Sequence, residues 1–201
     1  GDRHFIGATP ERLVEKTGAE MRTEALAGSI SAALPGAAER LLASEKDRAE
    51  HAFVVTAVLD ALRPLCATLE VSDTPIARPL RNILHLKTPI VGRLSSDVHV
   101  LDLVERLHPT PAVGGSPRAA ACSFLAHHEH LTRGFYAGPF GWMDLRGDGE
   151  FVVALRSALL DETHVDVFAG AGIVRGSHPD EEFSETELKM SNMLHALGLP
   201  I

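Results

Sequence analysis

The sequence has little of what marks secreted, membrane or nucleic-acid-binding proteins. Its only two cysteines, Cys66 and Cys122, stand in no motif spacing, which indicates reduced thiols of a cytoplasmic protein. No apolar run approaches the length of a membrane span, because Asp60 and Arg63 interrupt the longest candidate. The net charge is −8, and no run of Lys or Arg suggests a nucleic-acid surface. We therefore expect neither a membrane nor a nucleic acid as partner, and an anionic ligand would need local cations or a metal ion.

The length and the apolar content predict one substantial core. A chain of 201 residues that is 45% hydrophobic is large enough for one core or for one half of a larger domain. Neither an internal repeat nor a low-complexity segment occurs. The chain starts at Gly1, without a methionine, and enters a predicted strand with no preceding cap. We therefore expect that an N-terminal portion of the domain is missing.

The periodicity predicts antiparallel strands set apart from long helices. Strands are expected at residues 5–6, 12–15, 21–26, 140–145, 150–158 and 165–169, the last three as a meander. Helices are expected at residues 37–69, 98–107, 118–130 and 179–198, with irregular segments at 71–94 and 108–117. This order favours an α+β fold, with antiparallel sheets and flanking long helices.

The last predicted helix begins with acids on its inward face. Helical spacing aligns Glu182, Glu185 and Lys189 with the apolar Met193 and Leu197. Burying carboxylates costs free energy unless cations or hydrogen bonds compensate. The ordinary alternative is a solvated first turn with an ion pair between Glu185 and Lys189.

The long helix at 37–69 repeats this arrangement. Its apolar stripe is Val54, Val58, Leu62, Leu65 and Leu69. Traced backward, the same stripe meets Glu50 and Asp47, an acidic pair three residues apart. Two such pairs on separate helices, with few matching cations, suggest a hard divalent ion that prefers oxygen ligands, most plausibly Mg²⁺.

Three further residues are candidates, each with an ordinary alternative. Arg156 shares strand parity with small apolar residues, so it should point inward and needs an anion from the protein or from a substrate. His85 lies between two leucines, which is typical of a core histidine, although the neighbouring Thr88 leaves a ligand role open. Glu11 follows a proline at a turn, where an exposed acid is the ordinary interpretation.

Two tempting motifs are rejected. The glycine-rich segment 170–176 has its third glycine one residue late and lacks a βαβ unit, so it favours close backbone approach to a ligand over dinucleotide binding. The histidines in segment 127–130 face apart on a helix, which indicates a solvated helix end rather than a metal site.

Several blocks together resemble the chorismate-utilising enzymes, and among these most closely the isochorismate synthases. The resemblance covers essentially the whole chain and rests on the segments GATPE at 7–11, LAGS at 26–29, SEKDRAEH at 44–51, HPTPAVGG at 108–115, AGAGIV at 169–174 and ExxExxxK at 182–189. It implies that the chain is the C-terminal portion of a single chorismate-binding catalytic domain, part of an α/β/α sandwich.

The resemblance also implies roles for individual residues. Glu50 and Glu185 would hold Mg²⁺, with Asp47 and Glu182 assisting directly or through water. Glu11 would be the general acid that protonates the departing C4 hydroxyl while water adds at C2. The substrate chorismate would be bound by Gly28, His85, Thr88, Ala112, Val113, Tyr136, Arg156, Gly170, Gly172 and Lys189.

One departure from the family pattern leaves alternatives open. The family's general base is a lysine upstream of the acid motif, and no lysine precedes Glu11 here. We expect an isochorismate synthase of siderophore or menaquinone synthesis, and the alternatives are a salicylate synthase, an aminating chorismate enzyme or an inactive binding module. Aminating members usually carry Thr where this chain has Ala112. Protein partners cannot be inferred.

Overall fold

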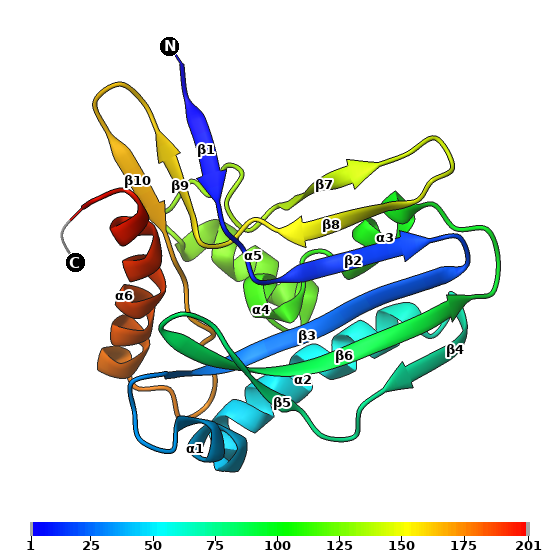
Figure 1. The fold of residues 1–201 in the computed structure, drawn as a ribbon, viewed down its shortest axis with the longest axis horizontal. Helices are drawn as coiled ribbons and strands as arrows, with labels where there is room; N and C mark the ends of the chain where they lie inside the picture. The colour runs from blue at the N-terminus through cyan, green and yellow to red at the C-terminus, as the bar shows by residue number, and fades with distance from the viewer. Residues whose placement is uncertain (1, 200–201) are drawn as a thin grey trace.

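The computed structural model describes residues 2–199 and builds them from strands and helices that are segregated into layers (Figure 1). The elements in chain order are β1 (His4–Gly7), β2 (Arg12–Thr17), β3 (Glu20–Ser31), α1 (Ala37–Ala43), α2 (Glu45–Leu62), β4 (Cys66–Val71), β5 (Ile76–Pro79), β6 (Ile83–Leu94), α3 (Val100–Leu107), α4 (Pro111–Gly114), α5 (Arg118–His128), β7 (Pro139–Met143), β8 (Gly149–Val153), β9 (Ser157–Leu160), β10 (Val165–Phe168) and α6 (Pro179–Ala196). Over the described range, these strands form a seven-stranded antiparallel sheet in the order β4-β6-β3-β2-β8-β7, with β5 also on β6, and a three-stranded sheet β1-β9-β10. The predicted α+β class is confirmed.

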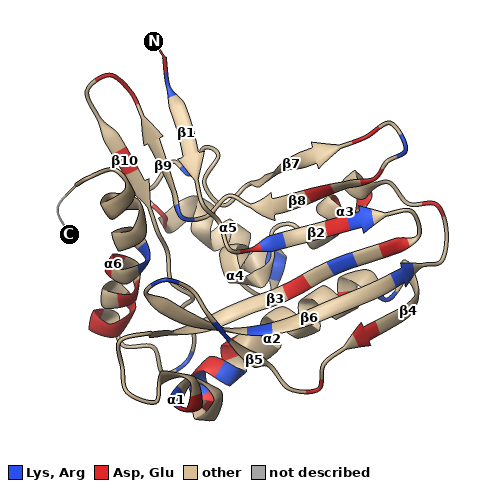
Figure 2. Cartoon of the chain, in the orientation of Figure 1, with Lys and Arg blue, Asp and Glu red and all other residues tan. Residues whose placement is uncertain are grey.

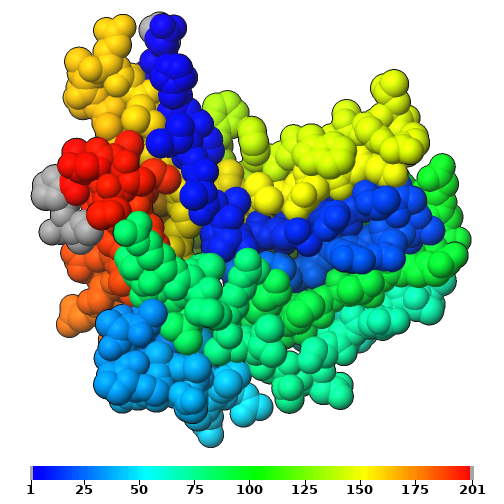
Figure 3. All heavy atoms as spheres, in the orientation of Figure 1, coloured from blue at the N-terminus to red at the C-terminus, as the bar shows by residue number. Residues whose placement is uncertain are grey.

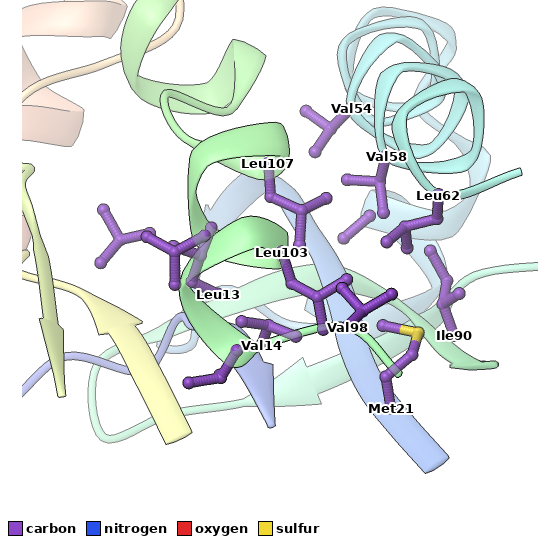
Figure 4. Close-up of a cluster of buried hydrophobic side chains, with 14 of the residues drawn as sticks. Leu13, Val14, Met21, Val54, Val58, Leu62, Ile90, Val98, Leu103 and Leu107 are labelled. Carbon is purple, nitrogen blue, oxygen red and sulfur yellow. The ribbon is translucent and has the colours of Figure 1, made fainter. Parts of the chain in front are cut away.

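The main core lies between the large sheet and helices α2 and α3. Val54, Val58 and Leu62 project from α2 toward Leu103 of α3 and Ile90 of β6 (Figure 4). All five side chains are at most 3% exposed. Burying each of them contributes about 1.5–3 kcal/mol, so the apolar stripe of α2 fixes this helix, and the acids that precede it, against the sheet.

The predicted helix 37–69 is wrong in its extent. Ser44 interrupts it, and its hydroxyl accepts a hydrogen bond from the backbone N–H of Asp47 (3.2 Å) as the N-cap of α2. The helix ends at Leu62 because Pro64 cannot continue it. Leu65 and Leu69 pack against the same core from the following loop and from β4, so they continued the apolar period without being helical.

The prediction of an irregular segment at 71–94 is also wrong. It contains β5 and the twelve-residue strand β6, which pairs with β3 over its whole length. The internal Pro89 argued against a central strand, since it lacks a backbone N–H for the ladder. The strand persists because its even-numbered positions, such as Leu86 and Ile90, are fully buried beneath the helices.

The predicted meander is two hairpins in different sheets. The pairing of β7 with β8 is confirmed, but residues 150–158 divide into β8 of the large sheet and β9 of the small one. Between them Arg156 adopts a left-handed backbone conformation with φ 50°. A short helix, α4, also forms inside the segment 108–117 that was expected to be irregular.

The chain crosses between the two sheets at two places that lie side by side. One crossing joins β1 to β2 and the other joins β8 to β9. They are connected by hydrogen bonds from Ala8 N to Arg156 O (3.1 Å) and from Val153 N to Glu11 O (3.0 Å). Glu11 and Arg156, 145 positions apart in sequence, are thereby held at one junction.

The acidic ends of two helices border this junction. Figure 2 shows acidic residues gathered in the first turns of α2 and α6. In Figure 3 the turn between β5 and β6 lies beside α6, where Asn82 donates hydrogen bonds to Ser191 (3.2 Å) and Asn192 (3.0 Å). None of the helices within residues 2–199 is long and apolar enough to cross a membrane.

Candidate active site

A cavity at the junction of the sheets brings together most of the residues predicted from the sequence. Together with the solvent at its open mouth it encloses about 840 Å³. The predicted residues that line it are Glu11, Gly28, Glu50, His85, Ala112, Val113, Tyr136, Arg156, Gly170, Gly172, Glu185 and Lys189. Asp47, Thr88 and Glu182 are not among its lining residues.

Glu11 is a buried acid, not the exposed turn residue of the ordinary interpretation. Its side chain is 6% exposed, and Thr110 Oγ1 donates to its Oε1 at 3.4 Å. Burial raises the pKa of Glu11 to about 7, although the Thr110 hydrogen bond lowers it in part. A carboxyl with such a pKa is partly protonated at neutral pH, which a general acid requires.

The buried Glu11 makes a measurable prediction for stability. Because its pKa is about 7 when folded and near 4.5 when unfolded, its stabilising contribution is fully present below pH 4.5 and is lost as the pH rises through 7. We expect the free energy of unfolding in urea to fall by about 2 kcal/mol between pH 5 and pH 8 on account of this group. Glu11→Gln should remove that part of the slope, whereas Glu70→Gln at an exposed position of β4 should not. Equal slopes in wild type and Glu11→Gln would contradict the assignment.

Arg156 points into the cavity, as the sequence predicted, but for a different reason. It lies between strands, and its inward direction comes from the left-handed turn and not from strand parity. Burial lowers the pKa of this half-buried guanidinium. Its Nη2 donates to His85 Nε2 at 3.0 Å, and no carboxylate of residues 2–199 lies within ion-pair distance of it. The protein acid of the ordinary interpretation is therefore missing from the described part of the chain.

Lys189 is the second predicted cation of the cavity. It forms the ion pair with Glu185 that the helical spacing allows (2.5 Å) and donates to the carbonyl of Gly170 (2.9 Å). The Gly170 loop follows β10 directly and leads into α6 without a βαβ unit, in agreement with the rejected dinucleotide motif. The ion pair of the ordinary interpretation thus exists, and it lies in the wall of the cavity.

Glu50 and Glu185 approach each other from α2 and α6. Burial, followed by the charge of Glu185, raises the pKa of Glu50 to about 7, and a hydrogen bond from the Gly28 backbone lowers it in part. Close packing by glycine makes this approach possible. A Cβ at Gly172 would lie 2.5 Å from Glu50 Oε1, and one at Gly28 would lie 3.0 Å from Asp47 Cβ. Gly28 also has φ 73° at the bulge of β3.

The four predicted metal ligands do not form a coordination cluster. No group of three or more His, Cys, Asp or Glu within residues 2–199 is arranged to hold a metal ion. Glu182 is instead paired with Lys46 (2.6 Å), and Asp47 lies beneath Gly28 outside the cavity lining. Of the four predicted ligands, only Glu50 and Glu185 line the cavity. A divalent cation could relieve the repulsion between their charges.

Thr88 is a correction to the predicted substrate contacts. Its hydroxyl lies 2.8 Å from Nε2 of the buried His51 on α2. His85 and Thr88 are three residues apart on one strand and therefore project from opposite faces. Only His85 reaches the cavity.

Arg133 is a cavity residue that sequence reasoning missed. Its guanidinium binds both carboxylate oxygens of Glu129 (2.6 Å each) and donates to the Val113 carbonyl (2.8 Å). The i, i+4 spacing of Glu129 and Arg133 was the available signal. On the same side, Tyr136 stacks on Phe168 with ring centroids 5.3 Å apart and forms an aromatic wall.

The exposed histidines at 127–128 bond to carbonyls of their own helix, as a solvated helix end should.

Every lysine of the chain is engaged in an ion pair. The four lysines pair as Lys16 with Asp148, Lys46 with Glu182, Lys87 with Glu24 and Lys189 with Glu185. Only Lys189 lines the cavity. The part of the chain that the structure describes thus offers no uncommitted lysine that could accept a proton there.

Comparison with known proteins agrees with this site. The family model described as chorismate binding enzyme matches residues 1–198. A salicylate biosynthesis isochorismate synthase of Pseudomonas aeruginosa is 47% identical over 98% of this chain and 43% of its own length. The crystal structure of MenF, the menaquinone-specific isochorismate synthase from Escherichia coli, matches with a TM-score of 0.86 at 37% identity, over 96% of this chain and 46% of that one. Anthranilate synthase component I from Streptococcus pneumoniae matches with a TM-score of 0.81 at 29% identity, over 96% and 44%.

The chain thus spans less than half the length of these relatives, while nearly all of it is matched. Both the family model and the relatives extend over the cavity and over the crossings that position Glu11 and Arg156. The chain belongs to the chorismate-binding enzyme family.

Proposed function

We propose that this chain carries the general acid, the metal-binding carboxylates and the substrate clamps of an isochorismate synthase, which isomerises chorismate to isochorismate. The observation that carries the proposal is one cavity in which a buried acid with a pKa of about 7, Glu11, faces the cations Arg156 and Lys189 and the carboxylates Glu50 and Glu185. The names of the relatives support it.

In this proposal Glu11 supplies the proton for the leaving group. Water adds at C2 of the ring, the double bonds shift, and the C4 hydroxyl departs as water after taking the proton of Glu11. A base must accept the proton of the incoming water. One water is added and one water leaves, so no atoms are gained or lost overall. The burial that raises the pKa of Glu11 keeps part of the acid protonated near neutral pH.

Arg156 and Lys189 would bind the two carboxylates of chorismate. A protein of net charge −8 repels a dianion at long range, so binding depends on cations concentrated at the site. Arg156 supports this role because no carboxylate of the described range forms an ion pair with it, although the charge of Glu185 acts on it from a greater distance. The Gly28, Gly170 and Gly172 backbones line the same cavity and allow a ligand to approach closely.

Mg²⁺ belongs to the proposal because the donor set fits it in part. Glu50 and Glu185 would hold the ion, with Asp47 and Glu182 acting through water, since Glu182 is engaged by Lys46. When bound, the ion would neutralise and polarise the ring carboxylate of chorismate. Burial, followed by the charge of Glu185, raises the pKa of Glu50, and a bound cation would favour its charged form.

The test is product analysis with a chimera. Residues 1–201 replace the matching segment of the Pseudomonas aeruginosa relative, which supplies the rest of the relatives' length. With chorismate and Mg²⁺ we expect isochorismate. Salicylate with pyruvate would indicate a salicylate synthase, an aminated product in the presence of ammonia would indicate an aminating enzyme, and no product from a folded chimera would indicate a binding module. Ala112 in the cavity lining, where aminating members usually carry Thr, favours the first outcome.

We expect that the 201-residue chain alone does not convert chorismate, even with saturating Mg²⁺. All four of its lysines are paired, and general-base assistance is worth about 10²–10⁴-fold. A coupled assay of the isolated chain, checked for cooperative unfolding, should show no turnover while the chimera is active. Turnover by the short chain at the rate of the chimera would place the base within these residues.

Arg156→Lys is expected to be far from conservative. The planar fork that binds a carboxylate through two hydrogen bonds is lost, so kcat/KM in the chimera should fall by roughly tenfold to a thousandfold. Arg175→Lys, at an exposed position of the loop before α6, is the matched control and should be silent. An unchanged kcat/KM in Arg156→Lys would instead assign Arg156 a structural role.

We further propose that the reaction serves siderophore or menaquinone synthesis in the cytoplasm. The names of the relatives support the role in these pathways. The two free thiols, Cys66 and Cys122, are in keeping with the cytoplasm.

A further inference from the structure

The side chain of Arg156 is oriented by a histidine instead of by an acid. Its Nη2 donates to His85 Nε2 at 3.0 Å, and this is its one side-chain hydrogen bond within residues 2–199. His85 is 7% exposed on β6, so its ring is fixed by packing. The guanidinium is half-buried and lines the cavity.

The chemistry of this contact fixes the state of the imidazole. A guanidinium has only donors, so Nε2 of His85 must present its lone pair and the ring proton must be on Nδ1. The Gly28 backbone acts against burial on this ring, because it raises the pKa of His85. Gly28 sits at the bulge where the pairing of β3 with β6 shifts, and a bulge leaves backbone groups free of the ladder.

A second observation agrees that the ring is neutral. Burial, and then the charges of Lys189 and Arg156, lower the pKa of His85 to about 3. The imidazole therefore carries no charge at any pH at which an enzyme of this kind would be assayed.

A neutral acceptor does what a carboxylate at this place could not do. Asp or Glu would orient the guanidinium equally well, but would also neutralise it and compete with the carboxylate of a ligand. An imidazole limits the rotamers of a long side chain and leaves its charge without a carboxylate partner, so that it is available to the ligand.

We propose that His85 is a positioning residue, and that its contact with Arg156 presents a guanidinium without a carboxylate partner to an anionic ligand. This refines the sequence-based expectation that His85 itself contacts substrate. The proposal rests on the proposed function in one respect, namely that the anion is chorismate.

The first experiment is independent of activity. Long-range ¹H–¹⁵N correlation spectra of the 201-residue chain should show His85 as the neutral tautomer with its proton on Nδ1 throughout pH 5.5–8. A spectrum with the proton on Nε2, or with both nitrogens protonated in this range, would overturn the arrangement.

The second experiment compares three variants that differ in one property each. His85→Gln keeps a neutral acceptor, His85→Glu adds a charge at nearly the same size, and His85→Leu removes the acceptor. Chorismate affinity, measured by calorimetry on chains whose cooperative unfolding has been verified, should stay within about threefold of wild type for Gln and weaken about tenfold for Leu. It should weaken more than tenfold for Glu. In the chimera the losses should appear in KM with kcat nearly unchanged, as expected when binding to substrate and transition state is weakened equally.

Each other outcome has a defined meaning. Equal affinities for His85→Gln and His85→Glu would remove the argument from charge, and wild-type affinity in His85→Leu would remove the positioning role. A large fall in kcat with His85→Gln would show that the imidazole itself touches the reacting atoms, against the proposal. If wild type does not bind chorismate, the proposed function has failed, and the spectra still decide whether His85 holds Arg156 as described.

Discussion

Replacing Glu11 by glutamine is expected to lower kcat of the chimera by about 10²–10⁴-fold, the usual contribution of a general acid. The amide fills the same buried space against Thr110 but has no acidic proton to donate. Chorismate binding, measured by calorimetry, should change little, because in the proposed function Arg156 and Lys189 bind the carboxylates of the ligand.

The pH dependence gives the same assignment a second test. Glu11 acts in its protonated form, so kcat/KM of the unmodified chimera should fall as the pH rises through about 7. Glu70→Gln should reproduce the unmodified profile. Full activity in Glu11→Gln would exclude Glu11 as the acid. So would a pH profile of kcat/KM that shows no fall near pH 7, or a fall that Glu11→Gln leaves unchanged.

Replacing Glu50 or Glu185 by glutamine is expected to abolish the response to Mg²⁺. An amide cannot supply the negative charge that opposes the ion. Two readouts are available. Turnover of the chimera should lose its expected dependence on Mg²⁺, and the 201-residue chain should lose the rise in melting temperature that we expect Mg²⁺ to produce in wild type.

The metal-free state should respond in the opposite direction for Glu50. Because Glu185 and burial disfavour its charged form, Glu50→Gln should raise the melting temperature at pH 8 without Mg²⁺. Glu45→Gln, at an exposed position in the first turn of the same helix, is the matched control and should leave both properties unchanged. Wild-type Mg²⁺ stabilisation in Glu50→Gln and Glu185→Gln would exclude these carboxylates as ligands.

The parts of the fold that could be predicted are those in which a local pattern has one structural solution. The stripe of Val54, Val58 and Leu62 had to face the core, and the predicted strands at 12–15 and 21–26 are close enough in sequence to pair as a hairpin. The twelve-residue strand β6 could not be predicted, because Pro89 contradicts a central strand, and the burial of alternate positions and the pairing with β3 that compensate for it appear only in the fold. The end of β8 at Val153 could not be predicted either, because no sequence pattern marks an arginine with a left-handed backbone conformation, such as Arg156.

The identity of the site residues could be predicted from the sequence, but many of their contacts could not. The resemblance and the acidic stripes named Glu11, Arg156, Glu50 and Glu185, and these four line one cavity. The pairing of Lys46 with Glu182 could not be foreseen, because it joins residues 136 positions apart. Nor could the contact between His51 and Thr88, which removes Thr88 from the cavity. Such contacts depend on how α2 and α6 are placed against the sheet, and a linear pattern does not contain that information.

The paired crossings between the sheets have a consequence for how the family can diverge. The acid and the guanidinium are spaced by main-chain hydrogen bonds, from Ala8 to Arg156 and from Val153 to Glu11, and not by the reach of neighbouring side chains. The cavity lining contributed by α4, including Ala112, takes no part in these two hydrogen bonds. If Glu11 and Arg156 have the roles proposed above, substitutions in α4 would change the cavity wall while the distance between these two residues stays the same, so a change of product would not require the reaction centre to be rebuilt.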